Sequence, residues 1–128
     1  MSLLLDTHTL FWWVTGSPML SSKAKTAITG EGRQCYVSSV SVFELSNKVR
    51  LGKFEAAREV VERFEFILAT DSFTPLPLAV AHAKLAGQLA SPHRDPFDRL
   101  LVAQSIVENC EIVTADPALA ALGARTIW

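Results

Sequence analysis

The chain has 128 residues and a formal net charge of -1, with 49% hydrophobic and 20% charged residues. This length suits one domain rather than two, and the composition excludes an intrinsically disordered chain. The charge excludes a broadly basic nucleic-acid binder, although it permits a local basic patch. The mean hydropathy of +0.25 is high enough for part of the apolar surface to belong to a partner.

Nothing in the sequence predicts a membrane span or an export signal. The N-terminal residues lack a cationic region, and their apolar run stops after residues 3–5. The apolar stretch 76–83 is far shorter than the ~18 residues of a membrane span. Cys35 and Cys110 lie outside any C-x-x-C spacing, so we expect two buried, reduced thiols. A cytoplasmic protein is the expectation.

Short apolar runs alternate with longer helical patterns, which is typical of a parallel sheet covered by helices. The first half of the chain predicts, in order, strand 3–5, helix 9–14, helix 22–29, strand 35–38, helix 41–51 and helix 55–69. The second half predicts strand 73–76, helix 78–89, helix 96–107, strand 111–114, helix 117–122 and strand 125–127. Pro75 and Pro77 favour a sheet edge for the third strand. We predict one α/β domain over residues 1–128, Rossmann-like, with a central parallel sheet of about five strands and helices on both faces.

Acidic side chains gather at the boundaries of these elements. Asp6 ends the first strand and Asp116 ends the fourth. Asp95 and Asp98 open the helix that leads into the fourth strand, and Glu44 lies in the first turn of the helix after the second strand. Strand ends and the following helix starts share the carboxyl edge of an open parallel sheet. We therefore expect Asp6, Glu44 and Asp116 to approach one another, with Asp98 joining them if its helix begins at that edge.

Helix capping is an alternative explanation for each acid taken alone. Asp95 and Asp116 each precede a proline that suits the first helical position, as N-caps do. Glu44 could complete a capping box with Ser41 or form an i, i+4 pair with Lys48.

A cluster of carboxylates is harder to explain by capping. Ionised carboxylates within a few ångströms repel and raise one another's pKa values, and a divalent cation relieves that repulsion. An oxygen-rich, histidine-poor site favours Mg²⁺ or Mn²⁺, and such an ion activates water against a phosphodiester. The residues thus favour metal-assisted phosphodiester hydrolysis. The alternative is a non-catalytic RNA-binding or protein-interaction module whose acids only cap helices. Asp71, the remaining aspartate, is expected in a solvated loop.

Three other enzyme classes fit the sequence poorly. A haloacid-dehalogenase-type phosphatase needs an acid two residues after its nucleophilic aspartate, where this chain has His8. A receiver domain needs a lysine after its last strand, but no lysine follows Lys84. The phosphate-binding G-x-x-x-x-G-K-S/T motif is absent, which excludes a P-loop enzyme.

Four segments, taken together, carry a resemblance to a known family. They are LLLDTHT at 3–9, SVFEL at 41–45, HRDPFDRLLVAQ at 93–104 and IVTADP at 112–117. The segment 93–104 is the most specific of the four. In order and spacing they resemble PIN-domain proteins, specifically the toxin ribonucleases of VapBC-type toxin–antitoxin pairs, over essentially the whole chain.

The resemblance implies a Mg²⁺-dependent endoribonuclease, with Mn²⁺ as an alternative ion, in which metal-activated water attacks phosphorus. Asp6 and Asp98 would be the principal metal ligands, and Glu44 and Asp116 would complete the acidic site. No acid of the family pattern is missing. Asp95 would either support the metal ligands without contacting the metal itself or serve only as a helix cap, and the sequence leaves both roles open.

Basic side chains near the acids are candidates for holding the phosphates of RNA. They are Arg94 and Arg99 beside the aspartates, and Lys48 and Arg50 on the helix of Glu44. The two arginines of the first pair could equally form salt bridges with the neighbouring aspartates. His8 and His93 lie near the predicted edge and are expected to be incidental loop residues.

The resemblance further implies two protein partners, a cognate antitoxin that covers the acidic groove and a second copy in a homodimer. The aromatic cluster 11–13 and the apolar helices spanning 41–68 are candidate interfaces. Packing in the core is the alternative for most of these aromatic side chains.

Overall fold

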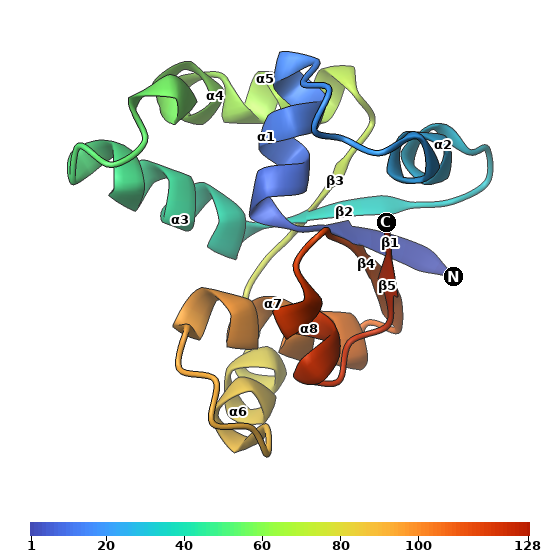
Figure 1. Cartoon of the computed structure of the whole chain (residues 1–128), viewed down its shortest axis with the longest axis vertical. Helices are drawn as coiled ribbons and strands as arrows, with labels where there is room; N and C mark the ends of the chain where they lie inside the picture. The colour runs from blue at the N-terminus through green and yellow to red at the C-terminus, as the bar shows by residue number, and fades with distance from the viewer.

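Three consecutive leucines form most of the central strand, and all three are fully buried because helices cover both faces of the sheet. The computed structural model describes residues 1–128 (Figure 1). Its strands are β1 (Ser2–Leu5), β2 (Cys35–Ser38), β3 (Thr74–Leu76), β4 (Cys110–Val113) and β5 (Thr126–Ile127). Its α-helices are α1 (Thr7–Thr15), α2 (Ser22–Thr29), α3 (Ser39–Arg50), α4 (Arg58–Glu62), α5 (Phe64–Thr70), α6 (Val80–Gln88), α7 (Pro96–Val107) and α8 (Pro117–Ala121), and a 3₁₀ turn, η1, covers Glu55–Ala57.

The five strands are all parallel and lie in the order β3-β2-β1-β4-β5. This confirms the predicted α/β class, the strand number and the edge position of the proline-containing strand β3. The chain leaves β1 toward β2 and β3 and later returns to place β4 on the other side of β1. The carboxyl ends of β1 and β4 are therefore the switch point, where open α/β sheets bind ligands.

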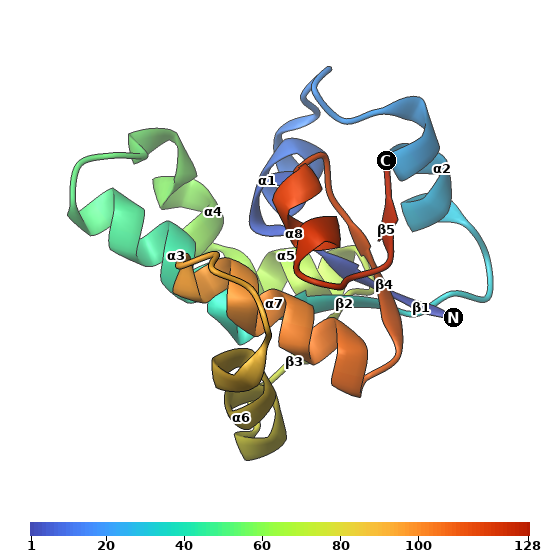
Figure 2. The same cartoon turned by 60° about the horizontal axis from the view of Figure 1, so that its bottom comes forward.

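Two apolar cores lie on opposite faces of the sheet (Figures 1 and 2). Leu3 and Leu5 point into the core formed with α1, α2 and α5, and Leu4 points into the core formed with α7 and α8. This alternation follows from the period of two in a β-strand. The alternation fixes the register of β1 and hence the position of Asp6, the residue that follows the strand.

The predicted single helix 55–69 is wrong, because the structure breaks it into η1, α4 and α5. Arg63 leaves helical geometry, with φ -105° and ψ 18°. The break lets the two halves face different partners. Val60 packs with Leu45 of α3, whereas Phe64 and Leu68 pack against the sheet.

The predicted capping box at Ser41 is also wrong. Helix α3 begins directly after β2, and Ser38 is its N-cap, accepting a hydrogen bond from the backbone N–H of Val40. Ser41 therefore lies inside the helix, and Glu44 lies in its second turn rather than its first.

Both cysteines are free and buried, as expected. Burial raises the pKa of Cys35, and burial together with Glu108 raises the pKa of Cys110 to about 11. No helix has the length and apolar character needed to cross a membrane.

Candidate active site

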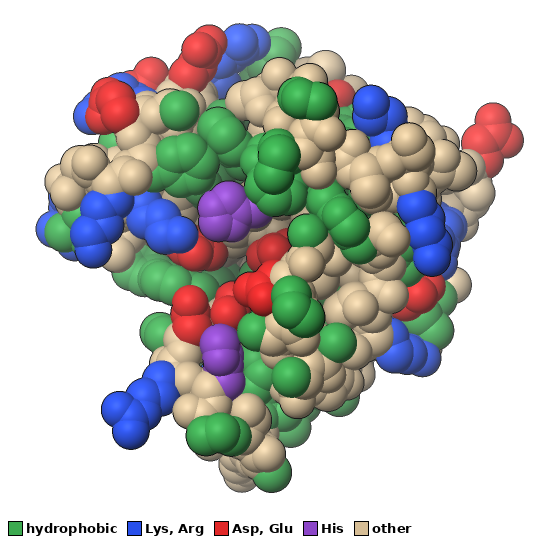
Figure 3. All heavy atoms as spheres, in the orientation of Figure 1, with side chains coloured by type: hydrophobic (Ala, Val, Ile, Leu, Met, Phe, Trp, Pro, Cys, Tyr) green, Lys and Arg blue, Asp and Glu red, His purple; other side chains and the backbone are tan.

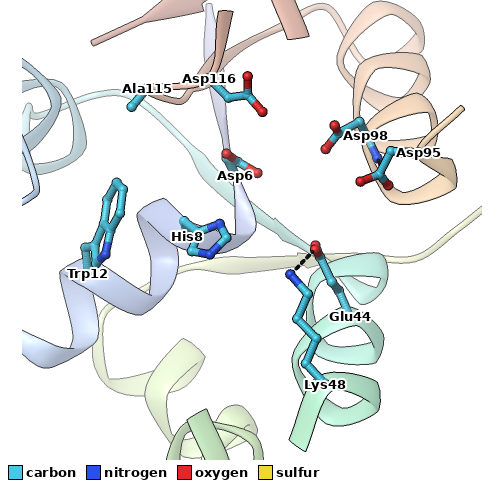
Figure 4. A pocket seen from close by; sticks show the side chains of 9 residues that line it. All are labelled: Asp6, His8, Trp12, Glu44, Lys48, Asp95, Asp98, Ala115 and Asp116. Atoms are coloured by element: carbon cyan, nitrogen blue, oxygen red, sulfur yellow. Dashed lines mark hydrogen bonds and ion pairs between the residues drawn. The ribbon is translucent and has the colours of Figure 1, made fainter. Parts of the chain in front are cut away.

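A pocket of about 360 Å³ opens at the carboxyl ends of β1 and β4, and five carboxylates line it. In the space-filling view the acids lie in a hollow that crosses one face of the molecule (Figure 3). The lining residues, drawn in Figure 4, are Asp6, His8, Trp12, Glu44, Lys48, Asp95, Asp98, Ala115 and Asp116. The structure thus brings together all five acids that the sequence marked as candidates.

Asp6 is fixed between β1 and α1. Its Oδ1 accepts a hydrogen bond from the backbone N–H of Thr7 at 2.7 Å, and its Oδ2 accepts one from Thr114 Oγ1 at 2.8 Å. Burial raises the pKa of Asp6, although these two bonds and the charge of His8 lower it, and the charge of Glu44 raises it further. The carboxylate is held rigidly in a place that disfavours its negative charge.

Asp98 lies in the first turn of α7, with Oδ2 2.8 Å from Nε2 of His93. Burial is the main cause that raises its pKa. The hydrogen bond from His93 opposes this, and repulsion from Asp95, Asp6 and Asp116 adds to it. His93, which the sequence suggested to be incidental, therefore orients this carboxylate.

Asp95 and Asp116 are N-caps, as predicted. Oδ1 of Asp95 accepts from the backbone N–H groups of Phe97 and Asp98 at 2.9 and 3.3 Å. Oδ1 of Asp116 accepts from that of Ala118 at 2.9 Å. Each cap uses one oxygen and leaves Oδ2 without a partner within the protein. Capping and ion binding are therefore compatible at both residues.

Glu44 and Lys48 form the predicted i, i+4 pair on α3, with 3.0 Å between Oε2 and Nζ. The pair is not an ordinary surface pair, because the Glu44 side chain is only 10% exposed. Lys48 is the one lysine or arginine that lines the pocket, and it offsets part of the acidic charge there.

The expected roles of Arg99, phosphate contact or pairing with a neighbouring aspartate, do not agree with its position. Four of its five N–H donors bind backbone oxygens at 2.7–3.1 Å, those of Ala86, Leu89, Ser91 and His93. It fastens the loop between α6 and α7 instead. Arg94 is exposed, lies outside the pocket lining and forms no ion pair with an aspartate.

Despite the shared pocket, no three His, Cys, Asp or Glu side chains are arranged as a ready-made metal site. Like charges keep apart when no cation lies between them. The donor set nevertheless fits a hard divalent ion, because it consists of carboxylate oxygens, and Glu44, Asp98 and Asp116 each keep one oxygen with no partner in the protein. Glu44 and Asp98 are also not helix caps.

The aromatic side chains at 11–13 each have a partner within the chain. Ring centroids are 4.6 Å apart for Phe11 and Phe54, 5.7 Å for Trp12 and Trp128, and 5.9 Å for Trp13 and Phe73. Packing therefore accounts for much of this cluster, which weakens its interpretation as a free interface. Asp71 is exposed at the end of α5, as expected, and accepts a hydrogen bond from Trp13 Nε1 at 3.2 Å.

Comparison with known proteins gives a family match over residues 3–124, to the PIN domain. Among curated proteins, Ribonuclease VapC22 of Mycobacterium tuberculosis (strain ATCC 25618 / H37Rv) is 30% identical over 121 residues, which cover 92% of this chain and 89% of that protein.

Solved structures share the fold over nearly the full length of both chains. VapBC2 from Rickettsia felis, bound to a DNA fragment of its promoter, superposes with a TM-score of 0.73 at 15% identity, covering 99% of this chain and 98% of the other. FitAcB from Neisseria gonorrhoeae superposes with a TM-score of 0.70 at 20% identity, covering 98% and 96%. The chain therefore belongs to the PIN-domain family, in which Ribonuclease VapC22 is one of its relatives.

Proposed function

We propose that this chain is a divalent-metal-dependent endoribonuclease that hydrolyses RNA phosphodiesters. The observation that carries the proposal is the pocket at the β1/β4 switch point, where five carboxylates meet in a chain 30% identical to a ribonuclease. The raised pKa values of Asp6 and Asp98 support it, because carboxylates whose charge is disfavoured gain stability when a cation joins them.

In this proposal Asp6 and Asp98 are the principal ligands of Mg²⁺, or alternatively of Mn²⁺, and Glu44 and Asp116 complete the site. A bound divalent ion would supply a water of lowered pKa and would stabilise negative charge on the phosphodiester. Thr7 and Thr114 hold the Asp6 carboxylate in one orientation. His93 does the same for Asp98.

Lys48 and Arg94 are the proposed phosphate contacts. Lys48 lines the pocket and is about one-third exposed, so Nζ could turn from Glu44 to a phosphate oxygen when the charge of Glu44 is engaged elsewhere. Arg94 lies on the loop before α7, where it would contact the RNA backbone at the rim. Asp95, whose Oδ2 has no partner within the protein, would act through a water molecule.

We also propose that the protein is the toxin of a type II toxin–antitoxin pair, with an antitoxin that covers the acidic pocket. The VapBC structures of the same fold support this partner. The exposed rings of Phe43 and Phe66 offer apolar area on α3 and α5 for the antitoxin or for a second copy in a homodimer. A cytoplasmic location would follow from RNA as the substrate.

A non-catalytic module whose acids only cap helices is the alternative function. It explains Asp6, Asp95 and Asp116, each of which caps a helix. It leaves Glu44 and Asp98 unexplained, since neither caps a helix and both side chains are largely buried beside other acids. These two residues favour the nuclease.

The test is cleavage of total RNA and of transfer RNA by purified, antitoxin-free protein, in Mg²⁺ or Mn²⁺ and in EDTA. We expect defined fragments that disappear with EDTA and with Asp98→Asn. Asp71→Asn, which changes an exposed aspartate outside the pocket, is the matched control and should cut like the wild type. Fragments that persist in Asp98→Asn would refute the site assignment, and the absence of cleavage in every pool would favour the non-catalytic module.

A further inference from the structure

One wall of the acidic pocket is aromatic. His8 and Trp12 are four residues apart on α1 and therefore share a helix face. Their ring centroids are 5.7 Å apart, and both line the pocket. In Figure 4 they lie on α1 across the pocket from Asp98 of α7 and Asp95, the N-cap of that helix, with Asp6 between the two walls.

The wall belongs to a longer line of rings, which we call the aromatic row: Phe54, His8, Trp12 and Trp128. Phe54 lies 6.1 Å from His8 with an interplanar angle of 28°, and Trp128 lies 5.7 Å from Trp12. His8 is exposed and the other three side chains are half-buried. The row thus presents ring surface to the pocket while its outer members hold the inner two in place.

Packing alone does not explain the row. Trp12 and Trp128 do contact the core formed with α1 and α2, so part of each ring is structural. Trp13 shows what purely structural packing looks like on the same helix, since it packs on Phe73 and does not line the acidic pocket. His8, in contrast, is exposed and gains little from burial.

The two walls suit the two parts of a nucleotide. The acids, through a bound cation, attract a phosphodiester, whereas flat ring faces attract a nucleobase. A base inside a duplex has both faces covered by its neighbours, but an unpaired base can stack on a protein ring. We infer that the rings of His8 and Trp12 stack an unpaired base of the RNA beside the scissile phosphodiester. This inference rests on the proposed nuclease function.

The test measures binding separately from cleavage. Protein carrying Asp98→Asn, which should not cut RNA, is titrated into a fluorescently labelled single-stranded RNA of mixed sequence, about 12 nucleotides long, and the anisotropy of the RNA is followed. Trp12→Ala should weaken binding about 5- to 30-fold and His8→Ala about 3- to 10-fold, whereas Trp12→Phe should stay within about 3-fold. Val80→Ala shortens an exposed apolar side chain of α6 outside the pocket and should leave binding unchanged.

Two further ligands sharpen the result. A strand of the same length with abasic sites and a fully paired duplex should each bind more weakly than the single strand, and neither should respond to Trp12→Ala. Equal binding of single strand and abasic strand, or unchanged binding in His8→Ala and Trp12→Ala, would overturn the inference. Because His8 is exposed, its variant separates lost stacking from lost folding. Cleavage by the Asp98-containing protein is measured separately. The experiment therefore distinguishes the absence of nuclease activity from the absence of base stacking.

Discussion

The charge of Asp98 is unfavourable in the folded protein when no cation is present. Burial and the charges of Asp95, Asp6 and Asp116 raise its pKa above the ordinary 3.8. A raised carboxyl pKa contributes stability only at low pH, and this contribution is lost as the pH rises through the folded-state value. Asp98→Asn should therefore raise the melting temperature in EDTA at pH 7, by about 4 °C for each ~1 kcal/mol of relieved repulsion.

Thermal melts of the variant and the wild type in EDTA check this prediction. The difference between them should shrink as the pH falls through the raised pKa of the folded protein, and it should disappear below pH 3.8, where the carboxyl is protonated in both the folded and the unfolded state. Asp71→Asn, at an exposed position, should melt like the wild type at both pH values. A lower melting temperature for Asp98→Asn at pH 7 would mean that the bond to His93 outweighs the repulsion.

At the scale of elements, Arg99 holds the loop between α6 and α7 in place. Its guanidinium binds four carbonyl oxygens of that loop and of the end of α6, including that of His93. Arg99→Met should leave these oxygens without donors and lower the free energy of unfolding by about 2–4 kcal/mol. Urea denaturation measures the loss.

The neighbouring arginine is the matched control. Arg94 is exposed and makes no hydrogen bond with its side chain, so Arg94→Met should change stability by less than about 0.5 kcal/mol. Arg99→Lys should lose most of the stabilisation, because an ammonium group lacks the planar fork of donors. Equal stability of Arg99→Met and Arg94→Met would show that the loop between α6 and α7 keeps its conformation without the hydrogen bonds of Arg99.

A second polar connection joins β2, α7 and the segment after β3. The Ser38 hydroxyl donates to Oε1 of Gln104, and Nε2 of Gln104 donates to the carbonyl of Pro77 at 3.3 Å. Ser38 and Gln104 are fully buried. Gln104→Leu should cost about 2–3 kcal/mol, because a buried hydroxyl and a carbonyl lose their partners.

Chemical denaturation again provides the measurement, and the midpoint should fall with an unchanged slope. Gln88→Leu makes the same replacement at an exposed position of α6 and should be nearly neutral. Equal midpoints for the two variants would mean that apolar packing of leucine compensates fully for the lost hydrogen bonds.

At the scale of the whole molecule, the sequence predicted those helices and strands whose boundaries are determined by local signals, such as a run of buried apolar residues or an N-cap. The strands 3–5 and 35–38 are buried runs, and helix 96–107 begins at an aspartate-proline cap, so local signals agree with the final fold. The pocket was predictable in outline because parallel strands place their carboxyl ends together. Its four aspartates were identified from their positions at element boundaries, whereas Glu44 was identified from a predicted first-turn position that the structure moves to the second turn of α3.

Other features depend on contacts between segments distant in sequence. The break at Arg63 follows from two different packing partners, and no proline or glycine marks it. Arg99 binds the loop between α6 and α7, and the path of that loop is defined only by the packing of α6 on α7. His93 and Trp12 gain their importance from what lies opposite them, which no local pattern encodes.

The whole protein should become more stable when Mg²⁺ or Mn²⁺ binds, because a ligand that binds only the folded state adds RT ln(1 + [L]/Kd) to its stability. Above the Kd, each tenfold increase in metal should add about 1.4 kcal/mol, or about 4 °C in melting temperature. Asp71→Asn should respond like the wild type. Asp98→Asn and Asp6→Asn should respond weakly or not at all, although the former begins from a higher melting temperature. A wild-type melting temperature that is the same in EDTA and at every metal concentration would contradict a metal site in the pocket and would favour the non-catalytic module.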